Sequence, residues 1–168
     1  MSDPVPVPSL QHGEQRVSGA LPTLLYIDLT WRTPVLLPPR FRGATLTRLQ
    51  EADALHRTAS ALFQRLSEVG SAGTPEEMAH PVTLLWRELQ RWDRLLQTDS
   101  HLAGPWASLA DLRVYPYIAT VKRLGLSLKE TLPHLEEWTV RMRSRSSVIR
   151  SWPEPWAGED GPRPLSGM

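Results

Sequence analysis

The five histidines of this 168-residue chain are the first candidates for catalysis or metal binding, and the chain has no cysteine. The absence of cysteine excludes disulfides, thiolate metal sites and a cysteine nucleophile. The histidines show no His-x-x-x-His spacing, so we predict no metal site. The chain also lacks G-x-S-x-G and phosphate-binding glycine motifs, which leaves a hydrolase or a nucleotide-binding enzyme without support. The five histidines are His12, His56, His80, His101 and His134.

A polar pair in the middle of the chain predicts where a buried helix begins. Ser108 and Asp111 form a capping-box pattern, in which the hydroxyl accepts from the amide of residue 111 and the carboxylate accepts from the amide of residue 108. Apolar residues then recur at helical spacing as far as Arg123-Leu124-Gly125, which predicts a helix buried along one side. They are Leu112, Tyr115, Ile118 and Ala119.

A second polar pair, Ser127 and Glu130, has the same capping-box pattern and predicts another structural cap. Pro133 follows closely and suits the first turn of a helix. The inner side of that helix is expected to consist of Leu135, Trp138 and Met142.

The first part of the chain predicts a short hairpin and then helices. Residues 8–11 and 14–17 alternate weakly and favour two short strands. Pro22 suits the first turn of a short helix, and residues 44–69 predict a long amphipathic one. We expect a short turn after residue 74 and a helix restart at Pro81, because that proline follows Pro75 too closely for one unbroken helix. The apolar stripe of the long helix is expected to be Leu46, Leu49, Ala52, Leu55, Ala59, Leu62, Phe63 and Leu66.

Aromatic residues supply candidates for an apolar pocket. Tyr115, Trp138, Trp152 and Trp156 either line such a pocket or belong to the core, since aromatic residues at helical spacing commonly pack inside a bundle. A run of arginines near the C-terminus either contacts phosphates or forms a solvated helix end. The net charge of +1 favours the second interpretation and predicts no nucleic-acid partner.

Composition indicates an ordinary globular protein, with 40% hydrophobic and 22% charged residues. No 18 apolar residues follow one another, and the first residues lack the basic and apolar regions of a secretion signal. We therefore expect a cytoplasmic protein without a membrane partner.

The order of motifs in the second half resembles one known family. LAG (102–104), S-x-A-D (108–111), a proline inside the following helix, and LPHLEEW (132–138) are similar to the C-terminal helical domain of glutathione S-transferases. The final SWPEPW (151–156) is most similar to the rho class. The resemblance implies a mainly α fold, in which a glutathione S-transferase C-terminal-like helical bundle follows a small partial thioredoxin-like remnant. We expect the remnant and linker at 1–43, the helical domain at 44–157 and a flexible tail at 158–168.

The front segment resembles the same family and implies where glutathione would bind. Val7-Pro8 is similar to the valine-proline pair that opens the third strand of the thioredoxin-like half. Gly19-Ala20 stands where the family has a Glu-Ser pair that holds the glutamyl end of glutathione. The main chain at Val7 can pair with the tripeptide backbone, and the amide of Ala20 can hold a carboxylate.

The implied activity is conjugation of glutathione, as substrate, to hydrophobic electrophiles. We expect this activity to be impaired and name no catalytic residue, because the residue that activates the thiol in the family belongs to a part upstream of Val7. The resemblance also implies a homodimer, in which Arg48, Arg57 and Arg65 face either the partner or solvent. A non-catalytic interaction or ligand-carrying module, and a truncated product, remain as alternatives.

Overall fold

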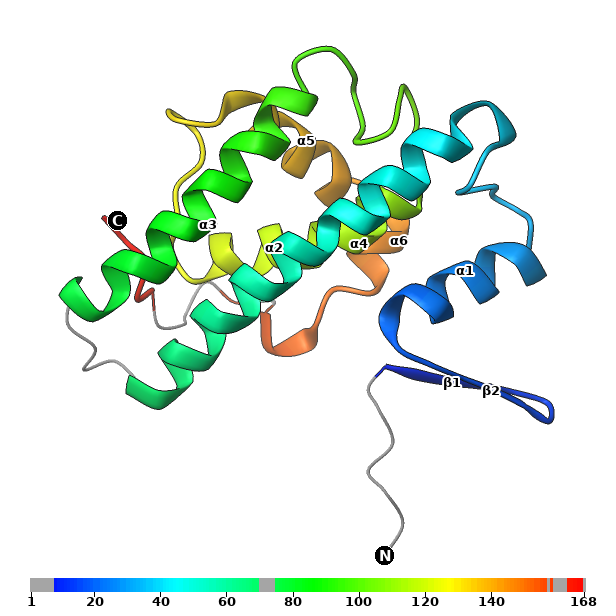
Figure 1. The fold of residues 1–168 in the computed structure, drawn as a ribbon, viewed down its shortest axis with the longest axis horizontal. Helices are drawn as coiled ribbons and strands as arrows, with labels where there is room; N and C mark the ends of the chain where they lie inside the picture. The colour runs from blue at the N-terminus through cyan, green and yellow to red at the C-terminus, as the bar shows by residue number, and fades with distance from the viewer. Residues whose placement is uncertain (1–7, 70–74, 157, 159–162, 168) are drawn as a thin grey trace, which may run out of the picture.

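The computed structural model describes residues 8–69, 75–156, 158 and 163–167, and it is mainly helical (Figure 1). The elements of the described residues are β1 (Ser9–His12), β2 (Gln15–Ser18), α1 (Ala20–Thr30), the 3-10 helix η1 (Pro39–Phe41), α2 (Arg42–Val69), α3 (Pro75–Leu95), α4 (Leu109–Arg123), α5 (Pro133–Arg143), α6 (Ser146–Arg150) and the 3-10 helix η3 (Glu154–Trp156).

The predicted hairpin is present and packs on α1. Strands β1 and β2 are antiparallel, with Leu10 opposite Val17, and Gly13 adopts a positive φ of 58° in the two-residue turn. The hydroxyl of Tyr26 on α1 donates to Gln15 Oε1 at 2.7 Å and pairs with His12 Nδ1 at 2.8 Å. Because two short strands are marginally stable alone, these contacts with α1 are what holds the hairpin in place.

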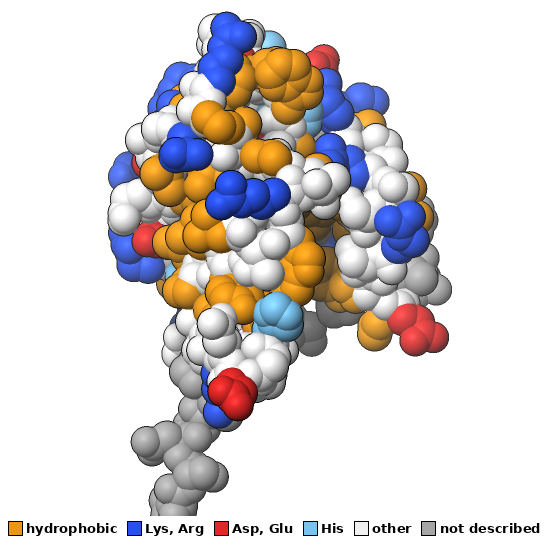
Figure 2. All heavy atoms as spheres, turned by 90° about the vertical axis from the view of Figure 1, so that its right-hand side faces the viewer, with side chains coloured by type: hydrophobic (Ala, Val, Ile, Leu, Met, Phe, Trp, Pro, Cys, Tyr) orange, Lys and Arg blue, Asp and Glu red, His pale blue; other side chains and the backbone are white. Residues whose placement is uncertain are grey.

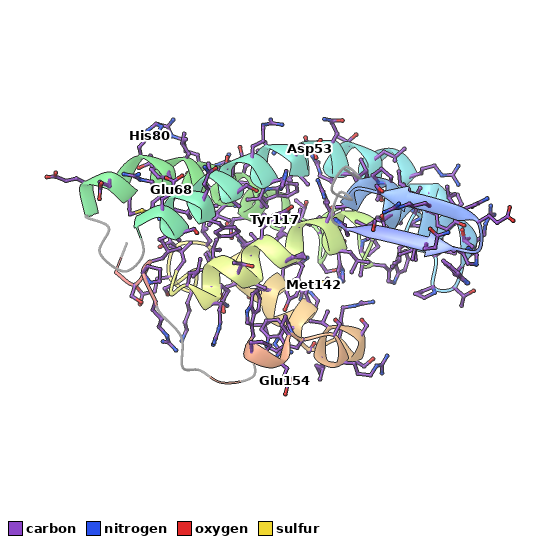
Figure 3. All side chains as sticks on the ribbon, turned by 90° about the horizontal axis from the view of Figure 1, so that it is seen from below. Asp53, Glu68, His80, Tyr117, Met142 and Glu154 are labelled. Atoms are coloured by element: carbon purple, nitrogen blue, oxygen red, sulfur yellow. The ribbon has the colours of Figure 1, made fainter. Side chains whose placement is uncertain are left out.

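The core lies among α2, α3, α4 and α5. Helices α2 and α3 run antiparallel side by side, and α4 packs against α2 (Figure 1). Viewed from below, α4 carries Tyr117 next to α2, the helix of Asp53 (Figure 3). The long helix predicted for residues 44–69 is confirmed, but Leu46 is 44% exposed, whereas Thr45 beside it and Leu49 one turn later are buried.

The proline at position 81 does not break its helix. The restart predicted at Pro81 is wrong, because α3 runs without interruption from Pro75 to Leu95. The side chains of Met78, Val82 and Leu85 around it are buried in the core. Burial of this stripe therefore outweighs the loss of one backbone donor in the second turn of the helix.

The second predicted cap does not open a helix. Residues 129–131 form a turn, in which the amide of Leu132 donates to Leu128 O at 2.8 Å, and α5 begins only at Pro133. Ser127 and Glu130 are therefore not a helix cap in this structure. The apolar residues Leu126 and Leu128 are buried, and anchoring them favours a turn over a helix in this segment.

Part of the segment expected as a flexible tail packs on the end of α4. Leu165 is fully buried, and its amide donates to Leu124 O at 2.9 Å. Gly125 has a φ of 103° and no side chain, which gives room for Ser166 beside it. Residues 163–167 thus belong to the packed structure.

Candidate functional site

Helix α4 carries two candidate cavities, and a buried carboxylate fixes the beginning of this helix. The capping box predicted for Ser108 and Asp111 is present, and the amide of Ser108 donates to Asp111 Oδ2 at 2.9 Å. The other oxygen, Oδ1, accepts from the amide of Leu102 at 3.0 Å and from the indole of Trp138 at 2.8 Å. One carboxylate thus joins the loop before α4 to α5, which sets the position of α4 in the bundle.

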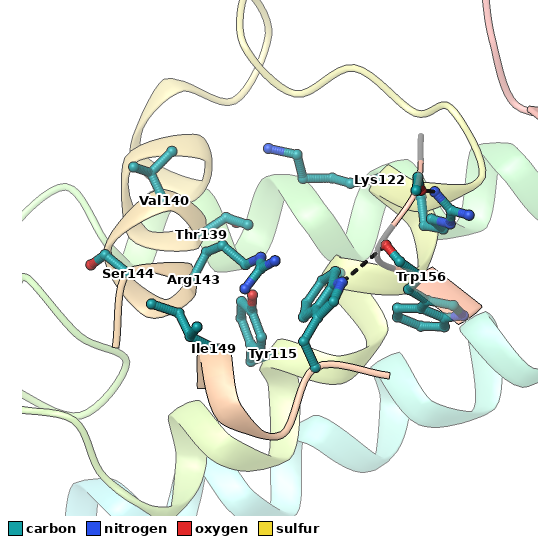
Figure 4. Close-up of a pocket in the computed structure, with 12 residues that line it drawn as sticks. Tyr115, Lys122, Thr139, Val140, Arg143, Ser144, Ile149 and Trp156 are labelled. Carbon is teal, nitrogen blue, oxygen red and sulfur yellow. Dashed lines mark hydrogen bonds between the residues drawn. The ribbon is translucent and has the colours of Figure 1, made fainter. Parts of the chain in front are cut away.

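The larger cavity lies between α4, α5 and the C-terminal segment, and we call it the tail cavity (Figure 4). Its volume is about 740 Å³, which is in the range of pockets for small organic molecules. It is lined by Tyr115, Ala119, Lys122, Arg123, Thr139, Val140, Arg143, Ser144, Ile149, Trp152, Trp156 and Gly158.

Two tryptophans form an ordered wall of the tail cavity. The indole N–H of Trp152 donates to the backbone carbonyl of Trp156 at 3.1 Å, shown as a dashed line in Figure 4. The two rings meet edge to face at 5.6 Å, and the Arg143 guanidinium lies 3.7 Å from the centroid of Trp152. These contacts fix the C-terminal segment over the cavity.

The polar groups of the tail cavity give it a positive character. Burial raises the pKa of the Tyr115 phenol above its ordinary value of 10.0, and nearby Arg143 opposes that shift. Tyr115 is therefore a neutral hydrogen-bond donor at physiological pH. Lys122 is paired with Glu136 at 2.6 Å, whereas Arg123 donates to the backbone carbonyl of Gly158 and keeps its charge without a carboxylate partner in the part of the chain that the structure describes.

Three of the four predicted pocket aromatics line this cavity, and the fourth does not. Tyr115, Trp152 and Trp156 are on its wall. Trp138 is 0% exposed, packs edge to face on Tyr115 at 6.0 Å and is a core residue bonded to Asp111. Helical spacing alone does not distinguish an aromatic residue of the cavity wall from one of the core.

The smaller cavity lies between the hairpin, α1 and α4, and we call it the hairpin cavity. Its volume is about 340 Å³. The lining residues are Pro8, Ala20, Thr23, Leu24, Leu112, Arg113, Pro116 and Tyr117.

Two of the four residues predicted to bind glutathione lie on the hairpin cavity. Pro8 and Ala20 line it, and Ala20 is the first residue of α1. Gly19 has a φ of 94° and donates its amide to Pro8 O at 2.8 Å, so that this amide is already used. Val7 lies outside the described residues.

Polar side chains on the hairpin cavity were not singled out by the sequence. Arg113 forms an ion pair with Asp53 at 3.1 Å, and the Tyr117 hydroxyl shares a hydrogen bond with His56 Nδ1 at 2.8 Å. The hydroxyl oxygen of Thr23 is buried and has no hydrogen-bond partner among the described residues. The sequence does not indicate that α4 packs against the start of α1. These two segments are about ninety positions apart, and the spacing of residues within one helix does not predict which distant helix it will contact.

The described residues form neither a metal-ligand cluster nor a membrane-spanning helix. No three acidic or histidine side chains are grouped there as ligands of a metal ion. None of the helices described combines the length and the apolar character that crossing a membrane would require.

Comparison with known proteins finds similarity to glutathione S-transferases. Residues 76–146 match the family model described as "Glutathione S-transferase, C-terminal domain". Glutathione S-transferase A of Pleuronectes platessa is 27% identical over 164 residues, an alignment that covers 89% of this chain and 69% of that protein.

Solved structures of transferases share the fold. A glutathione S-transferase from the Antarctic clam Laternula elliptica superposes with a TM-score of 0.81 at 20% identity, covering 95% of this chain and 74% of that one. The theta class glutathione S-transferase of Xanthomonas axonopodis pv. citri, with glutathione bound, gives 0.69 at 24% identity, covering 84% and 76%.

The resemblance seen in the sequence is thereby confirmed: residues 76–146 match the C-terminal domain model of glutathione S-transferases, and the chain is similar to a curated glutathione S-transferase and to solved ones. The predicted fold class is confirmed as well: a mainly α bundle of the C-terminal domain type, preceded by a small part of a thioredoxin-like domain.

Proposed function

We propose that this chain is a glutathione transferase-like protein that binds glutathione in the hairpin cavity and apolar molecules in the tail cavity. The proposal rests on one observation: Pro8 and Ala20 line the same cavity as Arg113 of α4. Glutathione has two carboxylates, and a helix N-terminus and a guanidinium are groups that bind carboxylates. The front part, 1–43, then contributes half of the binding site and the helical domain, 44–157, the other half.

The reaction that we propose is slow conjugation of glutathione to hydrophobic electrophiles. Conjugation needs a thiolate at neutral pH, and a hydrogen-bond donor directed at the sulfur stabilises it. The described lining residues offer only Tyr117 and Thr23 as hydroxyl donors, and Tyr117 is bonded to His56. The thiol is therefore activated weakly in this chain.

The tail cavity is suited to the apolar partner of the reaction or to a retained product. Its tryptophan wall offers apolar surface, and Arg143 and the neutral Tyr115 offer polar contacts. A homodimer and a cytoplasmic location belong to the same proposal, by analogy with the family.

Isothermal titration of glutathione, with a chloronitrobenzene conjugation assay on the same sample, tests this function. We expect Arg113→Gln to weaken glutathione binding by about tenfold or more, because a charged hydrogen bond is lost. Asp53→Asn is the matched control, since it removes the ion pair but keeps the guanidinium, and it should leave binding in place. Unchanged binding in Arg113→Gln, or no binding by the unmodified chain at millimolar glutathione, would refute the proposal.

A further inference from the structure

A surface away from both cavities combines exposed apolar residues with arginines. We call it the linker face, and it consists of Leu29, Trp31, Arg32, Val35, Arg40 and Arg42. Leu29 is 58% exposed, and Trp31 and Val35 are each 49% exposed, which is unusual for large apolar side chains so near one another in sequence. Figure 2 views this side of the molecule and shows hydrophobic and cationic side chains interleaved, with acidic ones only toward the edges.

The arginines of the linker face lack the kind of carboxylate partner that some arginines of the helical bundle have among the described residues. On the bundle, arginines such as Arg91 and Arg113 are bound to carboxylates at 2.7 and 3.1 Å. Arg32, Arg40 and Arg42 are exposed, and no carboxylate of the described residues lies within ion-pair distance of them. The linker face therefore carries positive charge that no carboxylate of the described residues pairs with.

A groove on the linker face brings the charges and the apolar groups together. Its volume is about 480 Å³, and Arg32 and Arg42 line it together with Leu29 and Val35. One carboxylate, that of Asp28, also lines it, but this side chain is buried and its Oδ1 accepts the amide of Leu36 at 2.7 Å. The groove thus offers two guanidinium groups beside aliphatic surface.

The linker face is held in one conformation by hydrogen bonds at both sides. Besides the bond from Leu36 to Asp28 on α1, the carbonyl of Leu36 accepts the amide of Leu109 at 2.9 Å, at the start of α4. A surface that is fixed in advance costs less conformational entropy when a partner binds.

We propose that the linker face binds an acidic amphipathic segment of another protein, with carboxylates on Arg32 and Arg42 and apolar side chains on Leu29 and Val35. Arginine and carboxylate pair through two parallel hydrogen bonds, and the aliphatic groups gain burial. A second copy of this chain fits less well, because a two-fold axis through the face would set arginines against arginines.

Nucleic acid also fits less well than an acidic protein segment. Single strands bind by stacking bases on open aromatic rings. Trp31 is the aromatic ring of the linker face, and His12 and Tyr26 pack on it at 4.8 and 6.4 Å. The remaining apolar groups are aliphatic and favour side chains over bases.

Fluorescence anisotropy with a labelled peptide tests this inference. The probe is an amphipathic peptide of about 18 residues built from leucine and glutamate at helical spacing, and its control has lysine in place of every glutamate. We expect the acidic peptide to bind, with an affinity that falls as salt is raised, and the lysine peptide not to bind. Arg32→Glu with Arg42→Glu should weaken binding by about tenfold or more, whereas Arg57→Glu on the exposed side of α2 should not.

The same series contains the results that would overturn the inference. They are equal binding of both peptides, unchanged affinity of the doubly reversed chain, or a preference for phosphatidylserine vesicles or an oligothymidine strand over the peptide. Self-association that the double reversal abolishes would identify a second copy as the occupant instead. Circular dichroism of each variant confirms that it is folded, so that a loss of binding reports on the linker face.

Discussion

Replacing Asp111 with alanine should remove a large part of the stability of the bundle. The buried carboxylate accepts the amides of Leu102 and Ser108 and the indole of Trp138. Asp111→Ala leaves these three donors buried without an acceptor, and each costs about 1–3 kcal/mol. Because water and local relaxation satisfy part of them, we expect a total of about 3–5 kcal/mol, against about 5–15 kcal/mol for the unfolding of a typical domain.

Urea denaturation followed by tryptophan fluorescence measures this loss directly. Glu130→Ala is the matched control, since Glu130 belongs to the capping-box pattern that caps no helix and is exposed, so its removal should change the free energy of unfolding by less than about 0.5 kcal/mol. If Asp111→Ala lowers the free energy of unfolding no more than Glu130→Ala does, the role assigned to the carboxylate is wrong.

Three further predictions concern Pro81 in α3, the buried His101 and the tail cavity. Pro81→Ala should raise the free energy of unfolding by about 1–3 kcal/mol, because alanine supplies the missing helix donor, and a lower value in urea would contradict it. Burial lowers the pKa of His101 below its ordinary 6.5, so the unfolded chain binds a proton before the folded one does. Stability should therefore be constant above pH 6.5 and decrease as the pH falls through the folded-state pKa, and His101→Gln should remove this dependence in denaturation curves taken across that range. Ala119→Trp should fill the tail cavity and abolish binding of an apolar naphthalene dye, measured by its fluorescence, and saturable binding by the variant would show that the dye sits elsewhere.

The helices were predictable where local chemistry and periodicity agree. The capping box at Ser108, the long stripe of α2 and the inner side of α5 are patterns within one element, and each produced the helix expected. The errors arose where a local rule was overruled by packing. Pro81 lies inside α3, where its neighbours are buried in the core. Ser127 and Glu130 do not cap a helix, because buried leucines on either side of Ser127 hold this segment in a turn.

The candidate site was less predictable, since it depends on contacts between distant segments. Aromatic spacing identified residues of the tail cavity but could not separate Trp138, whose indole faces the Asp111 carboxylate, from those on the wall. Arg113 reaches the hairpin cavity only because α4 packs beside α1, and nothing in its local sequence reports that neighbour.

The most direct test of the central claim is an amide-resolved NMR titration of the full chain with glutathione. We predict saturable shifts that are largest at Ala20, Thr23 and Arg113, which line the hairpin cavity. Shifts confined to residues around Trp152 and Trp156, or no shifts at millimolar glutathione, would contradict the assignment of glutathione binding to the hairpin cavity.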